Sequence, residues 1–306
     1  MGIGARDISA TELTEVAEGV LAYIQPDGGW CLNNTGVVYA GGEVLVVDTA
    51  ATEARTLRFR ELLEREVGLP RVVVNTHFHG DHTFGNFVFT PESMIFSHEN
   101  ARAESAAAEL GMRHLWPWVD WGEIRLVLAD MTYRDRASVH LGSLRVELHH
   151  PGPAHTTGDT VLWVPERRVL FAGDIVMSGV TPFCLMGSIS GTLRTLTWLR
   201  SFGAERIISG HGPAAGPEVF DVTEDYLRWT MRLAEQGRDR GRTPLQVAES
   251  TRLGRFGDLL DSERLVGNLH RAYAELSGAP EGVELDVLTI FEEMMAHHGG
   301  PLPCFA

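Results

Sequence analysis

Four side chains that can ligate a metal ion occur within six consecutive positions, 77–82, whose sequence is HFHGDH. This segment follows the β-branched run RVVVNT (71–76), which is typical of a buried strand. Two histidines at i and i+2 after a strand can direct both imidazoles onto one metal ion if Gly80 lets the chain curl. Asp81 and His82 then project at a different angle, so the pattern predicts a second metal ion beside the first.

Three further candidate ligands, His155, Asp174 and His211, stand at the ends of other apolar runs, in the sequences GPAHTTGD, FAGD and SGHG. A single histidine is more often a surface or core residue than a ligand, so the prediction depends on the cluster at 77–82 combined with these three positions. Two divalent ions about 3.5–4 Å apart activate a water molecule and polarise a carbonyl, which suits hydrolysis. The same ions could stabilise the enolate of a 1,3-diketone, from which a carbon–carbon bond can form.

The elements that must position these residues follow from the hydrophobic periodicity. Residues 1–216 are predicted to form a β-rich catalytic domain with surface helices, and residues 217–306 a helical C-terminal extension packed on it. The predicted strands are 14–24, 36–48 with a hairpin at Gly41-Gly42, 71–76, 94–97, 141–152, 159–174 with a turn at 165–168, and 205–210. The predicted helices are 51–67, 99–111, 190–203, 219–236, 244–252, 262–277 and 284–298.

Composition removes several classes of protein. All 26 basic residues among the 306 are arginine, which excludes lysine Schiff-base enzymes and lysine-dependent phosphate loops. A formal net charge of −15 argues against nucleic-acid binding. Three scattered cysteines give no disulfide framework, and neither a secretory signal nor a membrane-spanning run is found. We therefore expect a cytoplasmic protein that does not bind membranes.

The ordered set of ligand-type residues resembles the metallo-β-lactamase superfamily over residues 14–216. The resemblance implies a four-layer αββα sandwich of two mixed sheets flanked by helices. By the same resemblance the first metal has the ligands His77, His79 and His155, the second has Asp81, His82 and His211, and Asp174 bridges the two. Asp81 and Asp174 are the catalytic carboxylates that this resemblance implies. Asp48, at the end of the strand VLVVD, either supports the metal loop or only caps its strand, and the sequence does not distinguish these readings.

One departure narrows the class within this superfamily. The best-known zinc β-lactamases carry a cysteine where this chain has Asp174 and use a lysine to hold the drug, and this chain has neither. The resemblance therefore favours the hydrolase-like branch, which includes thioesterases, lactonases, phosphodiesterases and alkylsulfatases. The expected cofactors are two divalent ions, Zn²⁺ first, with iron or manganese also compatible with nitrogen and oxygen ligands. A binding module without catalysis is disfavoured because it would not need the complete ligand set.

Aromatic residues are concentrated in the segments expected to surround the metal site. Those expected to bind substrate are Trp30, Phe84, Phe87, Trp116, Trp118 and Phe183. For each of them an ordinary core position is an equally good reading, although the irregular stretch WPWVDWG (116–122) favours a pocket wall. Helix faces carrying Phe220, Tyr226 and Trp229 could close the other side.

Several segments are similar to metallo-β-lactamase-fold cyclases of aromatic polyketide pathways, namely QPDGGWCLNN, HTFGNFVF, WPWVDWG, TPFCLMGSISGTL and ERLVGNLHRAYAEL. That resemblance implies later-ring aldol closure and dehydration of a polyketide intermediate, with thioester release from an acyl carrier protein. The alternative is a metal-dependent hydrolase of small thioesters, lactones or esters that needs no carrier protein. The sequence leaves the oligomeric state open between monomer and homodimer.

Overall fold

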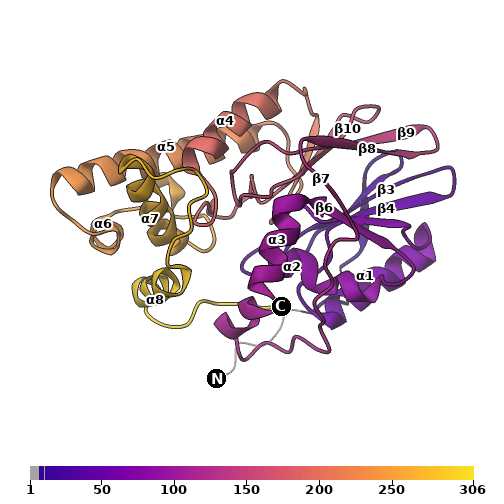
Figure 1. The fold of residues 1–306 in the computed structure, drawn as a ribbon, viewed down its shortest axis with the longest axis horizontal. Coiled ribbons are helices and arrows are strands. Elements are labelled where there is room, and N and C mark those ends of the chain that lie inside the picture. The colour runs from indigo at the N-terminus through magenta and orange to yellow at the C-terminus, as the bar shows by residue number, and fades with distance from the viewer. Residues whose placement is uncertain (1–6, 10) are drawn as a thin grey trace.

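The computed structural model describes residues 7–9 and 11–306, whose course is shown in Figure 1. The strands are β1 (Leu13–Ala17), β2 (Val20–Tyr23), β3 (Thr35–Ala40), β4 (Glu43–Val47), β5 (Val72–Val74), β6 (Met94–His98), β7 (Met131–Tyr133), β8 (Arg136–Leu141), β9 (Leu144–His149), β10 (Val161–Val164), β11 (Val169–Gly173) and β12 (Arg206–Ser209). The α-helices are α1 (Glu53–Glu66), α2 (Gly80–Thr83), α3 (Glu99–Ala108), α4 (Ile189–Arg200), α5 (Glu218–Asp239), α6 (Pro244–Ser250), α7 (Arg264–Leu276) and α8 (Val287–His298). Short 3-10 helices are η1 (Phe84–Val88), η2 (Gly111–Leu115) and η3 (Gly254–Phe256).

The strands form two mixed sheets. The first has seven strands in the order β1-β2-β3-β4-β5-β6-β7, antiparallel through β4 and parallel from β4 to β7. The second has the order β12-β11-β10-β9-β8, in which only β11 and β12 run parallel. Parallel neighbours need a crossover, which α1 supplies between β4 and β5 and α4 between β11 and β12. The segments that follow these strands carry the candidate ligands.

Three hydrophobic clusters define four layers. Val38, Leu45 and Val74 of the first sheet pack against Val146 and Leu162 of the second, which fills the space between the sheets. The outer face of the first sheet packs on Phe59, Leu62 and Leu63 of α1. The outer face of the second packs on Leu196 and Leu199 of α4 and Val219 and Phe220 of α5. The predicted four-layer αββα sandwich is confirmed, as Figure 1 shows.

One predicted strand is a hairpin in the structure, and another begins at a hairpin turn. The stretch predicted as one strand, 14–24, turns at Gly19, where φ is +76°, and becomes β1 and β2. A second turn at Gly142 (φ +51°) separates β8 from β9 within the region predicted from 141. In both cases the apolar alternation continues through the turn, so periodicity alone does not reveal the reversal.

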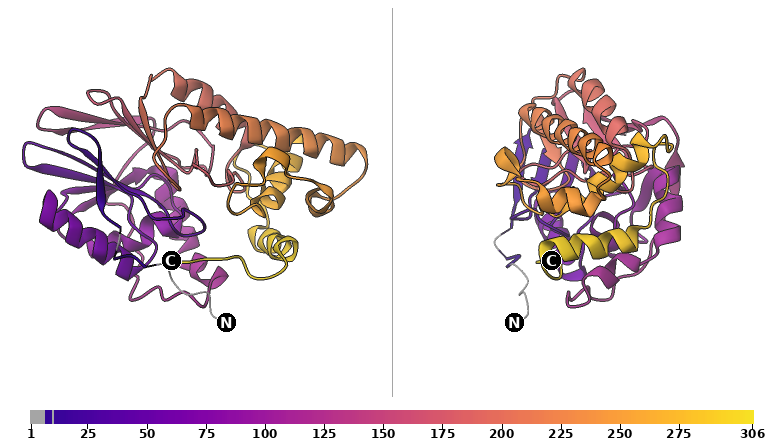
Figure 2. Two further views of the ribbon diagram at one scale, coloured as in Figure 1. Left: turned by 180° about the vertical axis from the view of Figure 1, so that it is seen from behind. Right: turned by 90° about the vertical axis from the view of Figure 1, so that its left-hand side faces the viewer.

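The C-terminal helices gather at one end of the sandwich, and the last residues return toward the N-terminal half (Figures 1 and 2). Leu265 and Leu269 of α7 and Phe291 of α8 share one hydrophobic cluster with Trp30 and Trp116. The returning tail is fixed by hydrogen bonds, one of them from the Trp116 indole to the Leu302 carbonyl at 3.0 Å. The extension therefore packs directly on the region around the candidate ligands. In the described part of the chain, no helix has the length and apolarity needed to cross a membrane.

Candidate metal centre

The first cluster of ligand atoms comes from three separate segments of the chain. Nε2 of His77, which follows β5, lies 3.0 Å from Nδ1 of His79. Nε2 of His155 lies 3.0 Å from the same His79 atom and 3.5 Å from Oδ2 of Asp174. Tetrahedral ligands on a zinc ion at about 2.0–2.1 Å are roughly 3.3 Å apart. These separations therefore fit one metal ion among the four side chains.

The second cluster combines one carboxylate with two imidazoles. Nε2 of His211, which follows β12, lies 3.3 Å from Oδ2 of Asp81 and 3.5 Å from Oδ2 of Asp174. Nε2 of His82 is 3.9 Å from the Asp81 carboxylate and 3.2 Å from Oδ1 of Asp174. The three side chains Asp81, His82 and His211 offer atoms close enough together to hold a second metal ion.

Asp174 lies between the two clusters. Its Oδ2 is near His155 and His211, and its Oδ1 is near His82. Nε2 of His82 and Oδ1 of Asp174 are buried and make no hydrogen bond of good geometry within the described chain. A buried polar atom without a partner is costly, and coordination of a metal ion would satisfy both of these atoms. The donor set thus fits two divalent ions with Asp174 between them.

Asp48 lies beneath both clusters. Its carboxylate accepts hydrogen bonds from the His82 Nδ1 at 2.8 Å and from the Thr76 hydroxyl and backbone N–H, each at 2.7 Å. The Thr76 hydroxyl in turn lies 3.0 Å from Nδ1 of His77. Hydrogen bonds of this kind orient a metal-binding imidazole and select its tautomer. Asp48 thus supports one histidine of each cluster, and its strained φ of +61° aims the carboxylate inward.

The other imidazoles are oriented by backbone carbonyls or by sulfur. Nδ1 of His155 donates to the Phe183 carbonyl at 2.5 Å, and Nδ1 of His211 donates to the Gly28 carbonyl at 2.9 Å. Nε2 of His79 faces the Met186 sulfur at 3.3 Å. Each of these contacts leaves the opposite ring nitrogen directed at the cluster.

The two clusters differ in charge. Burial, with the neighbouring His155, lowers the pKa of His79 to about 3, and burial also lowers the pKa of His77 and His155. Burial alone would also lower the pKa of His211, but the Asp174 and Asp81 carboxylates outweigh it and raise that pKa to about 9. The first cluster therefore presents neutral imidazoles, whereas the second holds positive charge that its carboxylates balance.

Glycines at the site give room for bulky neighbours. Gly80 was expected to relax the backbone, but it opens α2 without left-handed φ. A Cβ at Gly80 would collide with the Phe84 ring, and one at Gly210 would collide with the Asp174 carboxylate. The prediction that Gly80 is needed to let the backbone curl is therefore wrong. Glycine is needed there because a side chain would collide with the Phe84 ring.

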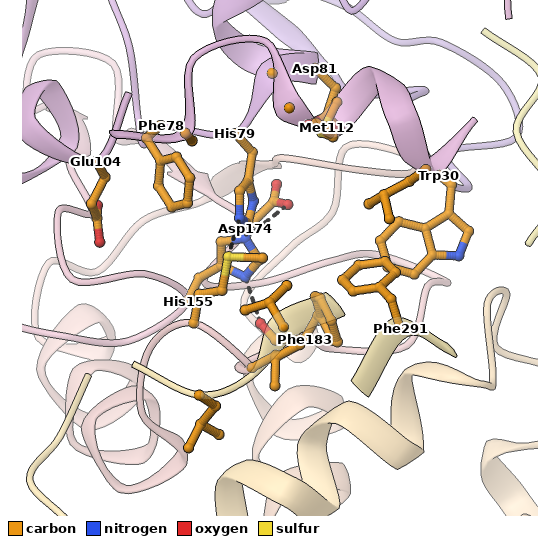
Figure 3. A pocket seen from close by; sticks show the side chains of 18 of the residues that line it. Trp30, Phe78, His79, Asp81, Glu104, Met112, His155, Asp174, Phe183 and Phe291 are labelled. Atoms are coloured by element: carbon orange, nitrogen blue, oxygen red, sulfur yellow. Dashed lines mark hydrogen bonds and ion pairs between the residues drawn. The ribbon is translucent and has the colours of Figure 1, made fainter. Parts of the chain in front are cut away.

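A cavity of about 590 Å³ opens above the clusters. His79, Asp81, His155, Asp174 and His211 reach it, whereas His77 and His82 lie buried behind them. Figure 3 shows His79, His155 and Asp174 at the centre, with aromatic rings of Trp30, Phe183 and Phe291 to one side. Such a cavity has the size and apolar lining of a small-molecule site.

Four of the six aromatic residues expected at the substrate site, Trp30, Phe84, Trp116 and Phe183, line this cavity. Phe87 and Trp118 do not. Phe87 packs at the edge of the cluster under α1 and lies below Arg125, and the Trp118 side chain is 40% exposed at the surface. Trp116, two residues away, is only 1% exposed. The loop turns the two tryptophans in opposite directions, which a pattern of residue types cannot reveal.

Other residues of the cavity wall come from parts of the chain that the sequence did not single out. Phe291 and Leu288 of α8, Met112 of η2 and Glu104 of α3 line the cavity. The residues expected there, Phe220, Tyr226 and Trp229, pack elsewhere, with Phe220 on the second sheet and Tyr226 and Trp229 against Phe256. An apolar stripe on a helix indicates burial, but it does not say whether a core or a cavity covers it.

The sequence matches the family model described as "Metallo-beta-lactamase superfamily" over residues 28–211. This match covers more than half of the chain, so the protein belongs to the metallo-β-lactamase superfamily. Its fold and its two ligand clusters place it among the metal-dependent hydrolases of that superfamily. The family match ends at His211, so α5 to α8 lie outside it.

Relatives of several kinds share parts of the sequence. The chain is 31% identical over 143 residues to the 2,4-dinitroanisole O-demethylase subunit alpha of Nocardioides sp. (strain JS1661), a match that covers 45% of this chain and 39% of that protein. It is 25% identical over 192 residues to the human acyl-coenzyme A thioesterase MBLAC2, covering 56% and 67%. It is 22% identical over 235 residues to the metallo-beta-lactamase type 2 of Bacteroides fragilis, covering 72% and 86%.

Solved structures share the fold at low sequence identity. A metallo-beta-lactamase from Pontibacter korlensis matches with a TM-score of 0.61 and 17% identity, covering 71% of this chain and 99% of that one. A metallo-beta-lactamase from Erythrobacter litoralis matches with a TM-score of 0.58 and 20% identity, covering 74% and 99%. The shared part is nearly the whole of each neighbour, whereas more than a quarter of this chain lies outside it.

Proposed function

We propose that this protein is a dinuclear metal-dependent hydrolase and cyclase that acts on an aromatic polyketide intermediate. It would close and dehydrate a later ring by aldol chemistry and release the product by hydrolysis of the thioester to an acyl carrier protein. Zinc is the proposed metal, with iron or manganese as the alternatives that nitrogen and oxygen ligands accept.

One observation carries the proposal, namely a 590 Å³ cavity that has two ligand clusters at its base and aromatic rings along its walls. Trp30 packs against Trp116, Phe183 and Phe291 with ring centroids 5.4–5.8 Å apart, so the wall is a continuous aromatic surface. Flat polycyclic substrates pack well on such surfaces. The volume lies within the range of about 300–1,000 Å³ for sites that hold drug-sized molecules.

Two divalent ions bound at the clusters would lower the pKa of a water molecule and polarise a carbonyl, which serves both thioester hydrolysis and, in a chain without lysine, aldol closure. His79 and His155 would hold the first ion at the cavity floor, and Asp81 and His211 the second. Burial alone would raise the pKa of Asp81, but the neighbouring His82 and His211 lower it to about 2, so Asp81 is already anionic before a metal ion binds. The aromatic wall would exclude bulk water from the reacting carbonyl.

The relatives support an acyl or aromatic substrate. One is named as an acyl-coenzyme A thioesterase and another as a 2,4-dinitroanisole O-demethylase. Hydrolysis of a thioester is therefore compatible with this fold, as is an aromatic substrate. The acyl carrier protein as partner rests on the resemblance of the sequence to polyketide cyclases.

The alternative function is hydrolysis of small thioesters, lactones or esters without a carrier protein. The relative named as an acyl-coenzyme A thioesterase favours it, since coenzyme A is a small carrier and not a protein. Both proposed functions use the same ligand clusters, and they differ in the substrate that the cavity holds.

The test compares substrates on the purified, zinc-loaded protein. A poly-β-ketone thioester, free or on a carrier protein, is expected to yield an acid and a cyclised aromatic product, followed by mass spectrometry. Asp174→Ala protein is the control for adventitious hydrolysis. Rapid turnover of glutathione thioesters or simple lactones, with no reaction of the poly-β-ketone thioester, would contradict the cyclase function and support hydrolysis of small substrates.

A further inference from the structure

One buried loop connects the C-terminal helices to the first ligand cluster. This loop, residues 181–185, is called the strap below. Thr181, Phe183, Cys184 and Leu185 are each at most 3% exposed. The Phe183 side chain lines the cavity, while its carbonyl accepts the hydrogen bond from Nδ1 of His155, drawn as a dashed line in Figure 3. The strap is therefore in direct contact with a candidate metal ligand.

Three buried polar side chains of α7 hold the strap by its backbone. Arg264, Asn268 and Arg271 are spaced i, i+4 and i+7, so they lie on one face of the helix. Arg264 donates to the Thr181 carbonyl at 3.2 Å. Asn268 donates to the Pro182 carbonyl at 2.7 Å and accepts from the Cys184 N–H at 2.8 Å.

Arg271 completes the attachment at the other end of the strap, where its Nε and Nη2 donate to the Leu185 carbonyl at 3.0 and 2.6 Å. Gly267 lets α7 approach, because a Cβ there would come within 2.7 Å of the Phe183 ring. The carbonyls of Thr181, Pro182 and Leu185 thus accept from α7, whereas the Phe183 carbonyl is presented to His155.

We propose that Asn268, with Arg271, is a positioning residue for the first ligand cluster, because it fixes the strap whose Phe183 carbonyl orients His155. With Nδ1 donating to that carbonyl, Nε2 of His155 points at Nδ1 of His79, 3.0 Å away, and at the Asp174 carboxylate. Partners one layer behind a metal ligand tune its orientation and the affinity for metal. The inference rests on the ligand role of His155 in the proposed function, but it does not depend on the substrate.

Within residues 7–9 and 11–306, the strap makes no hydrogen bond to the histidines of the second cluster. His211 is oriented by the Gly28 carbonyl, and His82 by Asp48, neither of which belongs to the strap. Loosening the strap should therefore weaken metal binding at the first cluster alone. A general loss of stability would weaken both clusters together, so the selectivity distinguishes positioning from mere structural support.

The experiment titrates the metal-free, full-length protein with Co²⁺ and follows the visible spectrum, which resolves two binding steps without any substrate. Asn268→Ala should weaken the step assigned to the first cluster roughly tenfold and leave the other step unchanged. His155→Ala identifies that step, because it removes a ligand of the first cluster only. Leu269→Ala is the matched control, since Leu269 is a fully buried residue of the same helix outside the strap contacts. It should lower the melting temperature and leave both steps unchanged.

Two results would overturn the proposal. One is wild-type affinity of both steps in Asn268→Ala, and the other is an equal weakening of both steps in Asn268→Ala and Leu269→Ala. If Asn268→Ala does not fold, Arg271→Lys decides by the same criteria, because it keeps the positive charge and loses the paired contact with the Leu185 carbonyl. Because the titration uses Co²⁺ alone, failure of the polyketide assignment would leave its outcome unaffected.

Discussion

The ligand-type side chains on the floor of the cavity are held by hydrogen bonds, whereas the part of the cavity wall that α8 supplies, called the far wall here, is held by apolar packing. On the floor, Asp48 fixes His82 and, through Thr76, His77. On the far wall, Phe291 of α8 contacts Trp30 and Trp116 through rings alone. Hydrogen bonds fix the direction of a donor atom, while apolar contacts mainly fix volume. The difference indicates that the family core carries the candidate ligands, whereas α8 shapes the space of the cavity.

The largest effect is expected where the floor depends on one shared carboxylate. Asp174→Ala should lower the metal content and abolish hydrolysis, because the side chain lies in reach of both clusters. Elemental analysis and a thioester assay on the same sample measure this. Asp221→Ala, which removes an exposed acid of α5, is the control. Retention of two metals and of activity in Asp174→Ala would contradict the ligand assignment.

The next effect concerns Asp48. Asp48→Asn keeps the size of the side chain and tolerates the left-handed φ of +61°, but it loses the carboxylate that accepts from His82. We expect a loss of about 10–100-fold in metal affinity or in kcat/KM. A competition assay with a chelator measures the affinity, and Asp286→Asn, at the start of α8, serves as control. An unchanged affinity would mean that Asp48 only caps its strand.

Removal of the metals should destabilise the floor of the cavity more than the far wall. Chelation is expected to lower the free energy of unfolding by about 3–4 kcal/mol for each ion removed, if the metals were present at 100–1,000 times their dissociation constant. Hydrogen exchange should show the loss of protection after β5, β11 and β12, while α8 keeps its protection. Equal loss of protection in α8 would show that the two regions are not separate.

A smaller and more selective effect is expected on the wall. Phe291→Leu should raise KM for a polycyclic aromatic thioester by about tenfold and leave kcat/KM for a small thioester and the metal content unchanged. The reason is that the Leu side chain leaves a gap in the aromatic surface around Trp30. Steady-state kinetics with the two substrates measure this. An equal effect on both substrates would mean that Phe291 contributes to the packing of the protein and not to the choice of substrate.

The smallest effect separates two neighbouring tryptophans. Trp118→Ser should change stability by no more than about 0.5 kcal/mol, with unchanged KM, because Trp118 lies outside the cavity. Trp116→Leu, at a position that lines the cavity and donates to the Leu302 carbonyl, should destabilise the protein and raise KM. Thermal unfolding and kinetics of the two variants test this contrast, and the same KM change in both would refute it.

Local sequence patterns predicted most of the candidate ligands on the floor of the cavity. The run RVVVNT and the HFHGDH segment are adjacent in sequence, so strand propensity and the spacing of ligand types carried the prediction of this loop. His155, Asp174 and His211 each follow a short apolar run. The structure brings all seven of these side chains together in two clusters, as the order of the motif suggested. The assignments to zinc, to the carrier protein and to the cytoplasm, and the choice between monomer and homodimer, stay predictions.

The residues of the cavity wall could not be predicted from local sequence patterns. Phe291 meets Trp30 across more than 250 residues, and Asn268 meets Pro182 across 86. Likewise, Trp116 is buried and Trp118 is exposed because of how their loop packs. The sequence does not separate the two, since both are tryptophans that adjoin Pro117. Contacts of this kind depend on the path of the whole chain, for which composition and periodicity hold no information.

The sequence by itself determined the candidate ligand set, because these residue types stand at the ends of apolar runs, and excluded lysine chemistry through its composition. The layered αββα architecture followed from the resemblance of this motif to the metallo-β-lactamase superfamily. Only the tertiary structure decided which aromatic residues face the cavity, which carbonyl orients each histidine, and that a helix beyond the family region holds the strap behind His155. The physical reason is that a ligand is chosen by its own side chain, whereas its orientation is set by groups that folding brings to it from elsewhere in the chain.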